Sequence, residues 1–143
     1  MDKFSNEITP IFNGEGITIE KDEGPREPNL EKIKSLSPAF IEDGTITAAT
    51  SSPISIGAAA ILVTSEKFAK ENSLDSRATI KARAVAGVHW DRMGMGPLPA
   101  TEKALSKSNL KIDDIQSIEL NEAFAAQALY VIRKGNWDIE KIN

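Results

Sequence analysis

One polar side chain lies where α/β proteins usually carry out chemistry. Asn121 follows an apolar run, residues 115–120, that predicts a buried strand, and it opens the Ala-rich stretch 121–127 (NEAFAAQ), which predicts a helix. Ligands of α/β folds usually bind at such a strand-to-helix junction. A carboxamide there can donate a hydrogen bond to a ligand, and it stays uncharged at every working pH. Asparagine is also a favoured helix N-cap, so the residue alone leaves both roles open.

Few other side chains are candidates for a functional role. Ser52 lies in the hydroxyl-rich segment 50–57, where an ordinary turn hydroxyl is the alternative role. His89 is the only histidine, and we assign it no catalytic role. The acidic pairs 22–23 and 113–114 lie in turn-like stretches without partner ligands, so we expect solvated surface there rather than a metal site. The sequence has no cysteine, which excludes disulfides, cysteine–zinc sites and a cysteine nucleophile within these residues.

Composition is that of a globular protein. The 143 residues are 41% hydrophobic and 27% charged, and this length suits one domain of about 100–150 residues. The net charge of −4 argues against nucleic acid and anionic membranes as partners. No apolar run approaches the roughly 20 residues of a membrane span, and the first residues do not resemble a signal peptide. We therefore expect a cytoplasmic protein without nucleic-acid or membrane partners.

The first half of the chain has short expected elements. Residues 7–12 and 17–19 predict two short strands separated by a glycine-containing break. Residues 30–36 place Leu30, Ile33 and Leu36 on one helical face. The β-branched run 61–64 precedes Ser65, a plausible N-cap for a short helix.

The second half alternates strand and helix patterns. Small and apolar residues fall on one face of 80–88, which predicts a strand, and Pro99 suits the first turn of a helix ending near Lys107. Strand 115–120 and helix 122–134 follow, and Gly135 ends that helix. This order favours an α/β fold in layers. We expect strands 80–88 and 115–120 to be neighbours in one sheet, with the helix packed on its face.

Five stretches, in the same order and at similar spacing, resemble the thiolases, enzymes that make or cleave 3-ketoacyl-CoA thioesters. Together they extend over essentially the whole chain. They are 3–11 (KFSNEITPI); 22–26 (DEGPR) with 30–32 (LEK) and 38–40 (PAF); 44–48 (GTITA) with 51–52 (SS) and 57–60 (GAAA); 93–97 (MGMGP); and 121–127 (NEAFAAQ).

The resemblance implies a partial thiolase fold, an incomplete layered α-β-α arrangement with a remnant of the family's loop domain. Residues 1–49 correspond to the loop-domain remnant, 50–76 to the last elements of the N-terminal domain, and 77–143 to the first half of the C-terminal domain. Family members also have an N-terminal half with the nucleophilic cysteine and a C-terminal segment with a histidine and a second cysteine. We therefore expect an internal fragment of a thiolase.

The resemblance also implies roles for particular residues. The counterpart of Asn121 holds a water that donates to the thioester oxyanion. Ser52 matches a serine that hydrogen-bonds the pantetheine arm of coenzyme A. Met93, Ala123 and Phe124 match residues that line the acyl and pantetheine channel, and core packing is the alternative for each.

Arg26 matches a residue near the nucleotide phosphates of coenzyme A, although an exposed arginine beside acidic residues is more often a solvated surface group. The chain also departs from the family pattern. Ile56 replaces an aspartate, His89-Trp90 replaces Asp-Pro, and one residue is missing between Arg26 and Leu30.

The implied function is acyl transfer between a 3-ketoacyl-CoA and coenzyme A, which is a substrate; no cofactor is expected. The segment 50–52 (TSS) is slightly more similar to the degradative, fatty-acid-oxidising members of the family. Expected partners are acyl-CoA, CoA, and either complementary thiolase segments or further copies in the parent enzyme. We expect the isolated chain to be inactive. The alternatives are a non-catalytic CoA-side or oligomerisation module derived from a thiolase, and an unrelated α/β domain.

Overall fold

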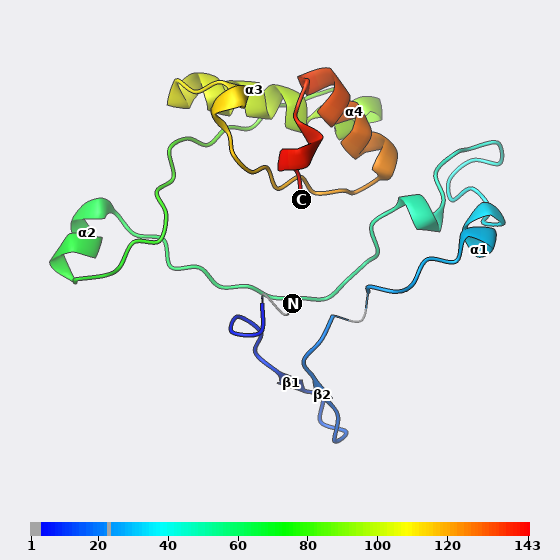
Figure 1. Cartoon of the computed structure of the whole chain (residues 1–143), viewed down its shortest axis with the longest axis horizontal. Helices are drawn as coiled ribbons and strands as arrows, with labels where there is room; N and C mark the ends of the chain where they lie inside the picture. Colours follow the sequence, from blue (N-terminus) through cyan, green and yellow to red (C-terminus); the bar gives the residue numbers. More distant parts are fainter. Residues whose placement is uncertain (1–3, 23) are drawn as a thin grey trace. The chain divides into compact units, whose positions relative to one another are not determined.

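The computed structural model describes residues 4–22 and 24–143, and these divide into two units, residues 1–35 and 36–143. Lys3 and Glu23, which belong to two of the family-like stretches, lie outside the described residues. Within the described part of the chain, none of the helices has the length and apolar character needed to cross a membrane. Figure 1 shows the elements of both units in chain order.

The first unit contains a short hairpin. Strand β1 (Ile11–Phe12) pairs antiparallel with β2 (Thr18–Ile19). The Asn13 side-chain oxygen accepts from the N–H groups of Glu15 (2.9 Å) and Ile17 (3.2 Å), and Gly14 and Gly16 in this turn both have positive φ. Glycine adopts such φ values without strain. The two short strands predicted around this break are therefore confirmed, although each is trimmed to two residues.

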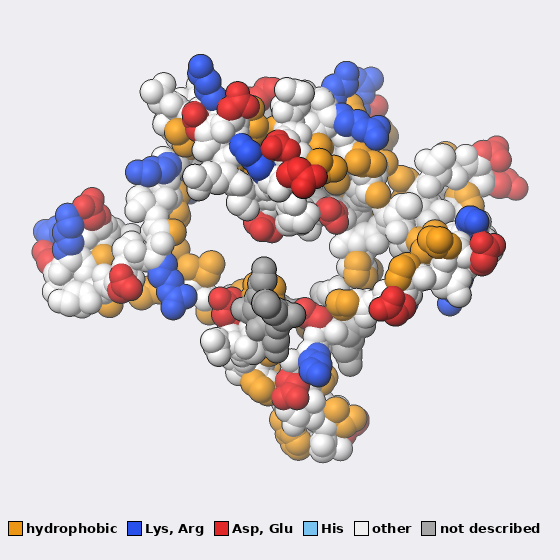
Figure 2. Space-filling model, in the orientation of Figure 1, with side chains coloured by type: hydrophobic (Ala, Val, Ile, Leu, Met, Phe, Trp, Pro, Cys, Tyr) orange, Lys and Arg blue, Asp and Glu red, His pale blue; other side chains and the backbone are white. Residues whose placement is uncertain are grey.

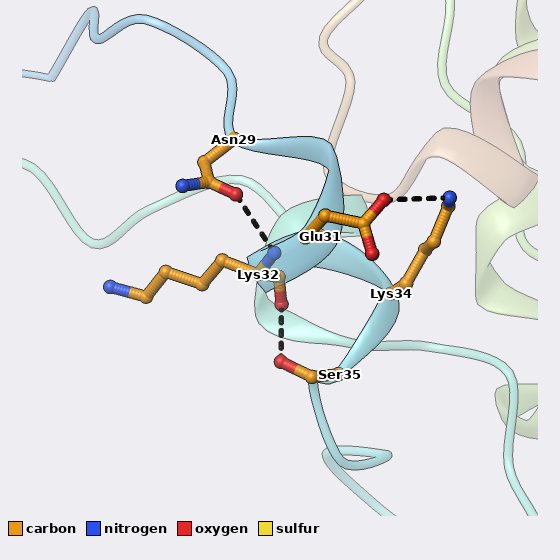
Figure 3. Close-up of polar contacts among 5 residues, drawn as sticks. All are labelled: Asn29, Glu31, Lys32, Lys34 and Ser35. Atoms are coloured by element: carbon orange, nitrogen blue, oxygen red, sulfur yellow. Dashed lines mark hydrogen bonds and ion pairs between the residues drawn. The ribbon is translucent and has the colours of Figure 1, made fainter.

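Helix α1 (Leu30–Lys34) follows, and its ends are held by local hydrogen bonds (Figure 3). The Asn29 side-chain oxygen accepts from the Lys32 N–H (2.9 Å). The Ser35 hydroxyl donates to the Lys32 carbonyl (2.9 Å), and Lys34 forms an ion pair with Glu31 (3.0 Å). All these groups are exposed, so the helix depends on local contacts rather than on a buried face.

The regular elements of the second unit are helices, joined by long segments without regular structure. Ser65 caps α2 (Glu66–Glu71), as predicted, by accepting from the Phe68 N–H (3.1 Å). The longer helices are α3 (Pro97–Ser108) and α4 (Ala125–Gly135), which contact each other. Short 3-10 turns connect the helices: η1 (Ala48–Thr50), η2 (Trp90–Met95), η3 (Ile112–Asp114) and η4 (Ile139–Lys141).

The core of this unit forms where α4 meets the segments on either side of it in the chain. Its buried residues are Leu120, Ala128, Val131 and Trp137, and Val131 is completely enclosed. Ala128 and Val131 are three residues apart on one face of α4. The helix was predicted to pack on the face of a sheet; it packs instead on the segment that contains Leu120, which is not part of a sheet, and it begins at Ala125.

The predicted sheet is wrong. In the described part of the chain, the only paired strands are β1 and β2, and neither 80–88 nor 61–64 forms a strand. Segment 115–120 contributes a single parallel bridge, Ile118 with Ile142, in which the Ile118 N–H donates to the Lys141 carbonyl (2.7 Å). An extended segment becomes a strand only when a neighbouring backbone pairs with it, and 80–88 has no such neighbour among the described residues.

The alternating pattern of 80–88 nevertheless has a structural counterpart. Ala82, Ala84 and Ala86 are half-buried, whereas the residues between them are exposed. Two α3 side chains lie along this segment: Lys107 donates to the Arg83 carbonyl (3.2 Å) and Lys103 to the Val85 carbonyl (3.5 Å). The predicted strand is wrong, and the alternation matches the burial of these three alanines only, since Ile80 and Val88 on the same predicted face are exposed.

Candidate functional site

A groove lies beside the start of α4, and we call it the Asn121 groove. It has a volume of about 690 Å³. Hydroxyl and amide side chains from residues 50–52, 121 and 143 line it together with aliphatic side chains of α4 and of residues 139 and 142. Its residues are Ala49, Thr50, Ser51, Ser52, Pro53, Leu120, Asn121, Glu122, Ala125, Ala128, Leu129, Ile132, Ile139, Ile142 and Asn143.

The wall formed by residues 49–53 is fixed by backbone contacts with the residues before α4. The Ser52 N–H donates to the Ala123 carbonyl (3.0 Å), and Ser51 forms an antiparallel bridge with Phe124. The Ser51 hydroxyl in turn donates to the Thr47 carbonyl (2.8 Å). This arrangement brings two segments that are far apart in the sequence, and that both carry candidate site residues, into direct contact.

Asn121 lines the groove but does not cap the helix. The N-cap of α4 is Phe124, whose side chain makes no capping hydrogen bond. Within the described residues, no hydrogen bond engages the Asn121 amide, which is exposed to solvent. The alternative role as N-cap is therefore wrong, and the amide is free to donate to a ligand in the groove.

Ser52, Ala123 and Phe124 lie together at this junction. The Ser52 side chain is exposed and lines the groove, whereas Ala123 and Phe124 are half-buried. The Phe124 ring contacts the Phe40 ring edge-on, with centroids 5.8 Å apart and planes at 77°. Phe40 is itself largely exposed, so this contact is not core packing, and the roles expected for Phe124 stay predictions.

Met93 lies on a neighbouring element, η2, and does not line the groove. Its side chain is exposed, but the turn that carries it contacts α4 closely. A Cβ added at Gly94 would lie 3.0 Å from the Gln127 Cγ, so only a glycine lets the turn approach α4 this closely without displacing Gln127. Arg26 is exposed and belongs to the other unit, residues 1–35.

Sequence reasoning missed several groups at this site. Asn143 lines the groove, and its side-chain oxygen accepts from the Leu120 N–H (2.7 Å). The Gln127 Oε1 atom is buried without a hydrogen-bond partner. The sequence carries little signal for Asn143, because its role depends on which segments meet in three dimensions, whereas Gln127 belongs to the stretch 121–127 and lies outside the groove lining. Phe40, within the family-like PAF stretch, could have been predicted as a partner for another apolar side chain.

The groove has few charged side chains. Glu122 is the only charged side chain among the residues that line it. His89 lies outside the groove, where its Nδ1 contacts the Asp91 carboxylate at 2.5 Å on an exposed surface. No group of three or more potential metal ligands occurs in the described ranges. The groove is therefore suited to a ligand that uses hydrogen bonds and apolar contacts.

Comparisons with known proteins identify similar sequences and folds. The model of the thiolase N-terminal domain matches residues 1–67, and that of the thiolase C-terminal domain matches residues 74–143. An acetyl-CoA acetyltransferase of Cupriavidus necator is 44% identical, over 99% of this chain and 37% of the relative. This chain therefore spans slightly more than a third of the length of the curated relatives it matches.

Solved thiolase structures resemble it closely. Human mitochondrial 3-ketoacyl-CoA thiolase in complex with CoA has a TM-score of 0.90 and 37% identity, covering 99% of this chain and 36% of the human chain. The dimeric peroxisomal thiolase of Saccharomyces cerevisiae has a TM-score of 0.92 and 39% identity, covering 99% and 36% respectively.

Proposed function

This chain belongs to the thiolase family and has a partial thiolase fold, and on that premise we propose that it supplies part of an acyl-CoA acyltransferase. The complete enzyme cleaves or forms 3-ketoacyl-CoA by acyl transfer to coenzyme A. Coenzyme A is a substrate in this reaction, and no further cofactor is involved. Complementary thiolase segments, or further copies in the parent enzyme, are the proposed protein partners.

The observation that supports this proposal best is the free Asn121 amide in a groove that also exposes Ser52. Carbon–carbon cleavage places negative charge on a thioester oxygen, and a preorganised donor at that oxygen contributes about 10²–10³-fold in rate. An unengaged, uncharged amide meets this requirement, because it loses no existing hydrogen bond when it donates to a bound water or to the oxyanion. Asn121 is our proposed oxyanion-hole residue.

The remaining site residues are proposed to contact coenzyme A and the acyl chain. Ser52 hydrogen-bonds the pantetheine arm, since its hydroxyl is exposed at the groove wall. Met93, Ala123 and Phe124 line the acyl and pantetheine channel. Arg26 faces the nucleotide phosphates.

We also propose the finer organisation of the parent protein. Residues 1–49 belong to the loop domain, 50–76 to the N-terminal domain and 77–143 to the C-terminal domain, within a layered α-β-α fold. The enzyme acts in fatty-acid oxidation in the cytoplasm.

These 143 residues on their own are proposed to be inactive. Acyl transfer in thiolases proceeds through an acyl-cysteine, and this sequence contains no cysteine. Catalytic groups that depend on one another lose activity when any one of them is missing, so Asn121 without a nucleophile does not give turnover. The same groove would bind coenzyme A weakly, because it supplies only one wall of the channel.

A chimera tests the function. The matching region of the Cupriavidus necator acetyltransferase is replaced by this chain, and cleavage of acetoacetyl-CoA with free CoA is measured for the chimera and for the chain alone. We expect turnover by the chimera and none by the chain alone. If the chain alone cleaves acetoacetyl-CoA faster than its Asn121→Ala variant, the proposal that catalysis requires other thiolase segments is contradicted. A folded chimera that binds CoA without turnover would instead favour a non-catalytic module.

A further inference from the structure

Two carboxamide side chains line the Asn121 groove, those of Asn121 and Asn143. Other side chains that line it are aliphatic and exposed, such as Leu129 and Ile139. Figure 2 shows hydrophobic side chains gathered over the part of the second unit that contains α4. Asn121 is the proposed donor to the oxyanion, and the hydrogen bond of Asn143 indicates how the second amide serves the first.

Asn143 continues a parallel ladder with its side chain instead of its backbone carbonyl. The Ile118 N–H donates to the Lys141 carbonyl (2.7 Å), and the Asn143 N–H donates to the Ile118 carbonyl (3.1 Å). The next rung of a regular parallel pair would join the Leu120 N–H to the Asn143 carbonyl. Here the Leu120 N–H donates to the Asn143 Oδ1 atom (2.7 Å). This rung therefore depends on the identity of residue 143, because an aliphatic side chain has no acceptor.

The backbone around Asn121 is held at two points. On one side, Leu120 is bound by Asn143, and its side chain is buried in the core. On the other side, the Ala123 carbonyl accepts from the Ser52 N–H (3.0 Å). Among the described residues, no hydrogen bond involves the two residues between these points. The position of the Asn121 amide is therefore set by its neighbours, and one of the two contacts comes from a side chain.

We propose that Asn143 is a positioning residue for Asn121: its Oδ1 atom fixes the backbone immediately before Asn121 and so holds the carboxamide in the groove. A donor contributes to catalysis when it is held where charge develops. A misplacement of about 1 Å, caused by a substitution away from the reacting atoms, can cost about 10²-fold in rate. This inference rests on the proposed acyltransferase function.

Lys141 provides an internal contrast in the same part of the chain. Its Nζ atom donates to the carbonyls of Ile115 (2.8 Å) and Asp113 (3.3 Å). These hydrogen bonds also join the last residues to the segment before α4, but they lie at the opposite end of that segment from Asn121. Lys141→Met is therefore the matched control, because it removes side-chain hydrogen bonds to the same segment without changing the contact next to Asn121.

Hydrogen exchange followed by NMR on the full chain tests the contact itself. We expect Asn143→Ala to speed exchange of the Leu120 amide hydrogen about fivefold, as the loss of a typical hydrogen bond predicts. Asn143→Asp keeps an oxygen acceptor at the same position, so we expect Leu120 to stay protected. The amide of Val131, whose side chain is completely enclosed, is the reference that neither variant changes. The proposal is overturned if Leu120 is unprotected in the wild-type chain, or if Asn143→Ala leaves its exchange unchanged.

The kinetics of the chimera test the effect on Asn121. We expect Asn143→Ala to lower kcat for acetoacetyl-CoA cleavage about tenfold with little change in KM for CoA, because only the oxyanion donor is displaced. We expect Lys141→Met to leave kcat unchanged. In the double variant, Asn121→Ala with Asn143→Ala, we expect the kcat of Asn121→Ala alone, since a positioning residue has no effect once the group that it positions is absent.

Two kinetic results would overturn the proposal. In the first, the effects of Asn121→Ala and Asn143→Ala multiply in the double variant, so Asn143 does not act through Asn121. In the second, Lys141→Met lowers kcat as much as Asn143→Ala, so the effect comes from general packing. If Asn121→Ala itself leaves kcat unchanged, the proposed function is wrong, and the exchange of the Leu120 amide alone then decides whether Asn143 holds this backbone.

Discussion

Gly135, the last residue of α4, lies against the Trp137 indole, one of the four buried core side chains. A Cβ at position 135 would lie 2.3 Å from the Trp137 Nε1 and within 3 Å of two further ring atoms. Because the indole is rigid and enclosed, it cannot move away as the end of a flexible side chain would. Glycine is needed at position 135 because a side chain would not fit beside the indole. Its backbone conformation does not require glycine, since the left-handed residue that ends the helix is Asn136.

We therefore predict that Gly135→Ala lowers the free energy of unfolding. Alanine improves helix propensity by about 1 kcal/mol, but overpacking against a buried ring costs about 1–3 kcal/mol. The steric cost is larger, so we expect a net loss of roughly 1 kcal/mol. Urea unfolding followed by Trp137 fluorescence, in a Trp90→Phe background, measures the change. Gly57→Ala is the control, since a Cβ there meets nothing within 4 Å. An equal effect of both variants would contradict the steric explanation.

The sequence predicted that Asn121 lies at a junction before a helix, but it did not predict how the side chain is engaged there. Asn121 does lie between the 115–120 segment and a helix. Its amide forms no hydrogen bond among the described residues and lines a groove. The N-cap alternative failed because α4 starts four residues later, after an extended Phe124. Residues such as Asn143 could not have been predicted, since their role comes from contacts between segments distant in the sequence.

Helices and strands differ in how far the sequence alone determines them. Helix hydrogen bonds are local, so capping residues and periodicity predicted α2, α3 and α4 to within a few residues. A strand requires a partner, and the β-pattern of 80–88 carries no information on whether that partner lies within these residues. The pattern therefore matches the partial burial of Ala82, Ala84 and Ala86, but the predicted strand and its pairing with 115–120 were wrong.

The hairpin and α1 in residues 1–35 lead to a prediction about local stability. Every described residue from 4 to 35 is exposed, so these elements are held by local hydrogen bonds without a buried core. Elements of this kind open at little free-energy cost. We expect amide hydrogens of residues 5–35 in the isolated chain to exchange rapidly in a mass-spectrometry time course. Residues 125–135, around the enclosed Val131, serve as the protected reference. Strong protection through 5–35 would refute this expectation.

The second unit combines a small packed core with long segments, 53–63 and 77–88, that form no backbone–backbone hydrogen bonds with the rest of the described residues. Among the described residues, four form the buried core, whereas many large hydrophobic side chains are exposed. Buried apolar area is the main source of stability, so we expect the chain alone to have a small free energy of unfolding. The family assignment accounts for this: the chain spans about a third of its relatives, and the Asn121 groove is proposed to be one wall of a site completed by other segments.

The most direct test of the account is the effect of Asn121→Ala on the chimeric acetyltransferase described above. We predict a fall in kcat for acetoacetyl-CoA cleavage of about 10²–10³-fold with little change in KM for CoA, because a donor to the developing oxyanion acts mainly in the transition state. Ser52→Ala is expected to raise KM instead, and Asn72→Ala, at the end of α2, is the control without effect. If Asn121→Ala leaves kcat unchanged in an active, folded chimera, the proposed role of the Asn121 groove in catalysis is wrong.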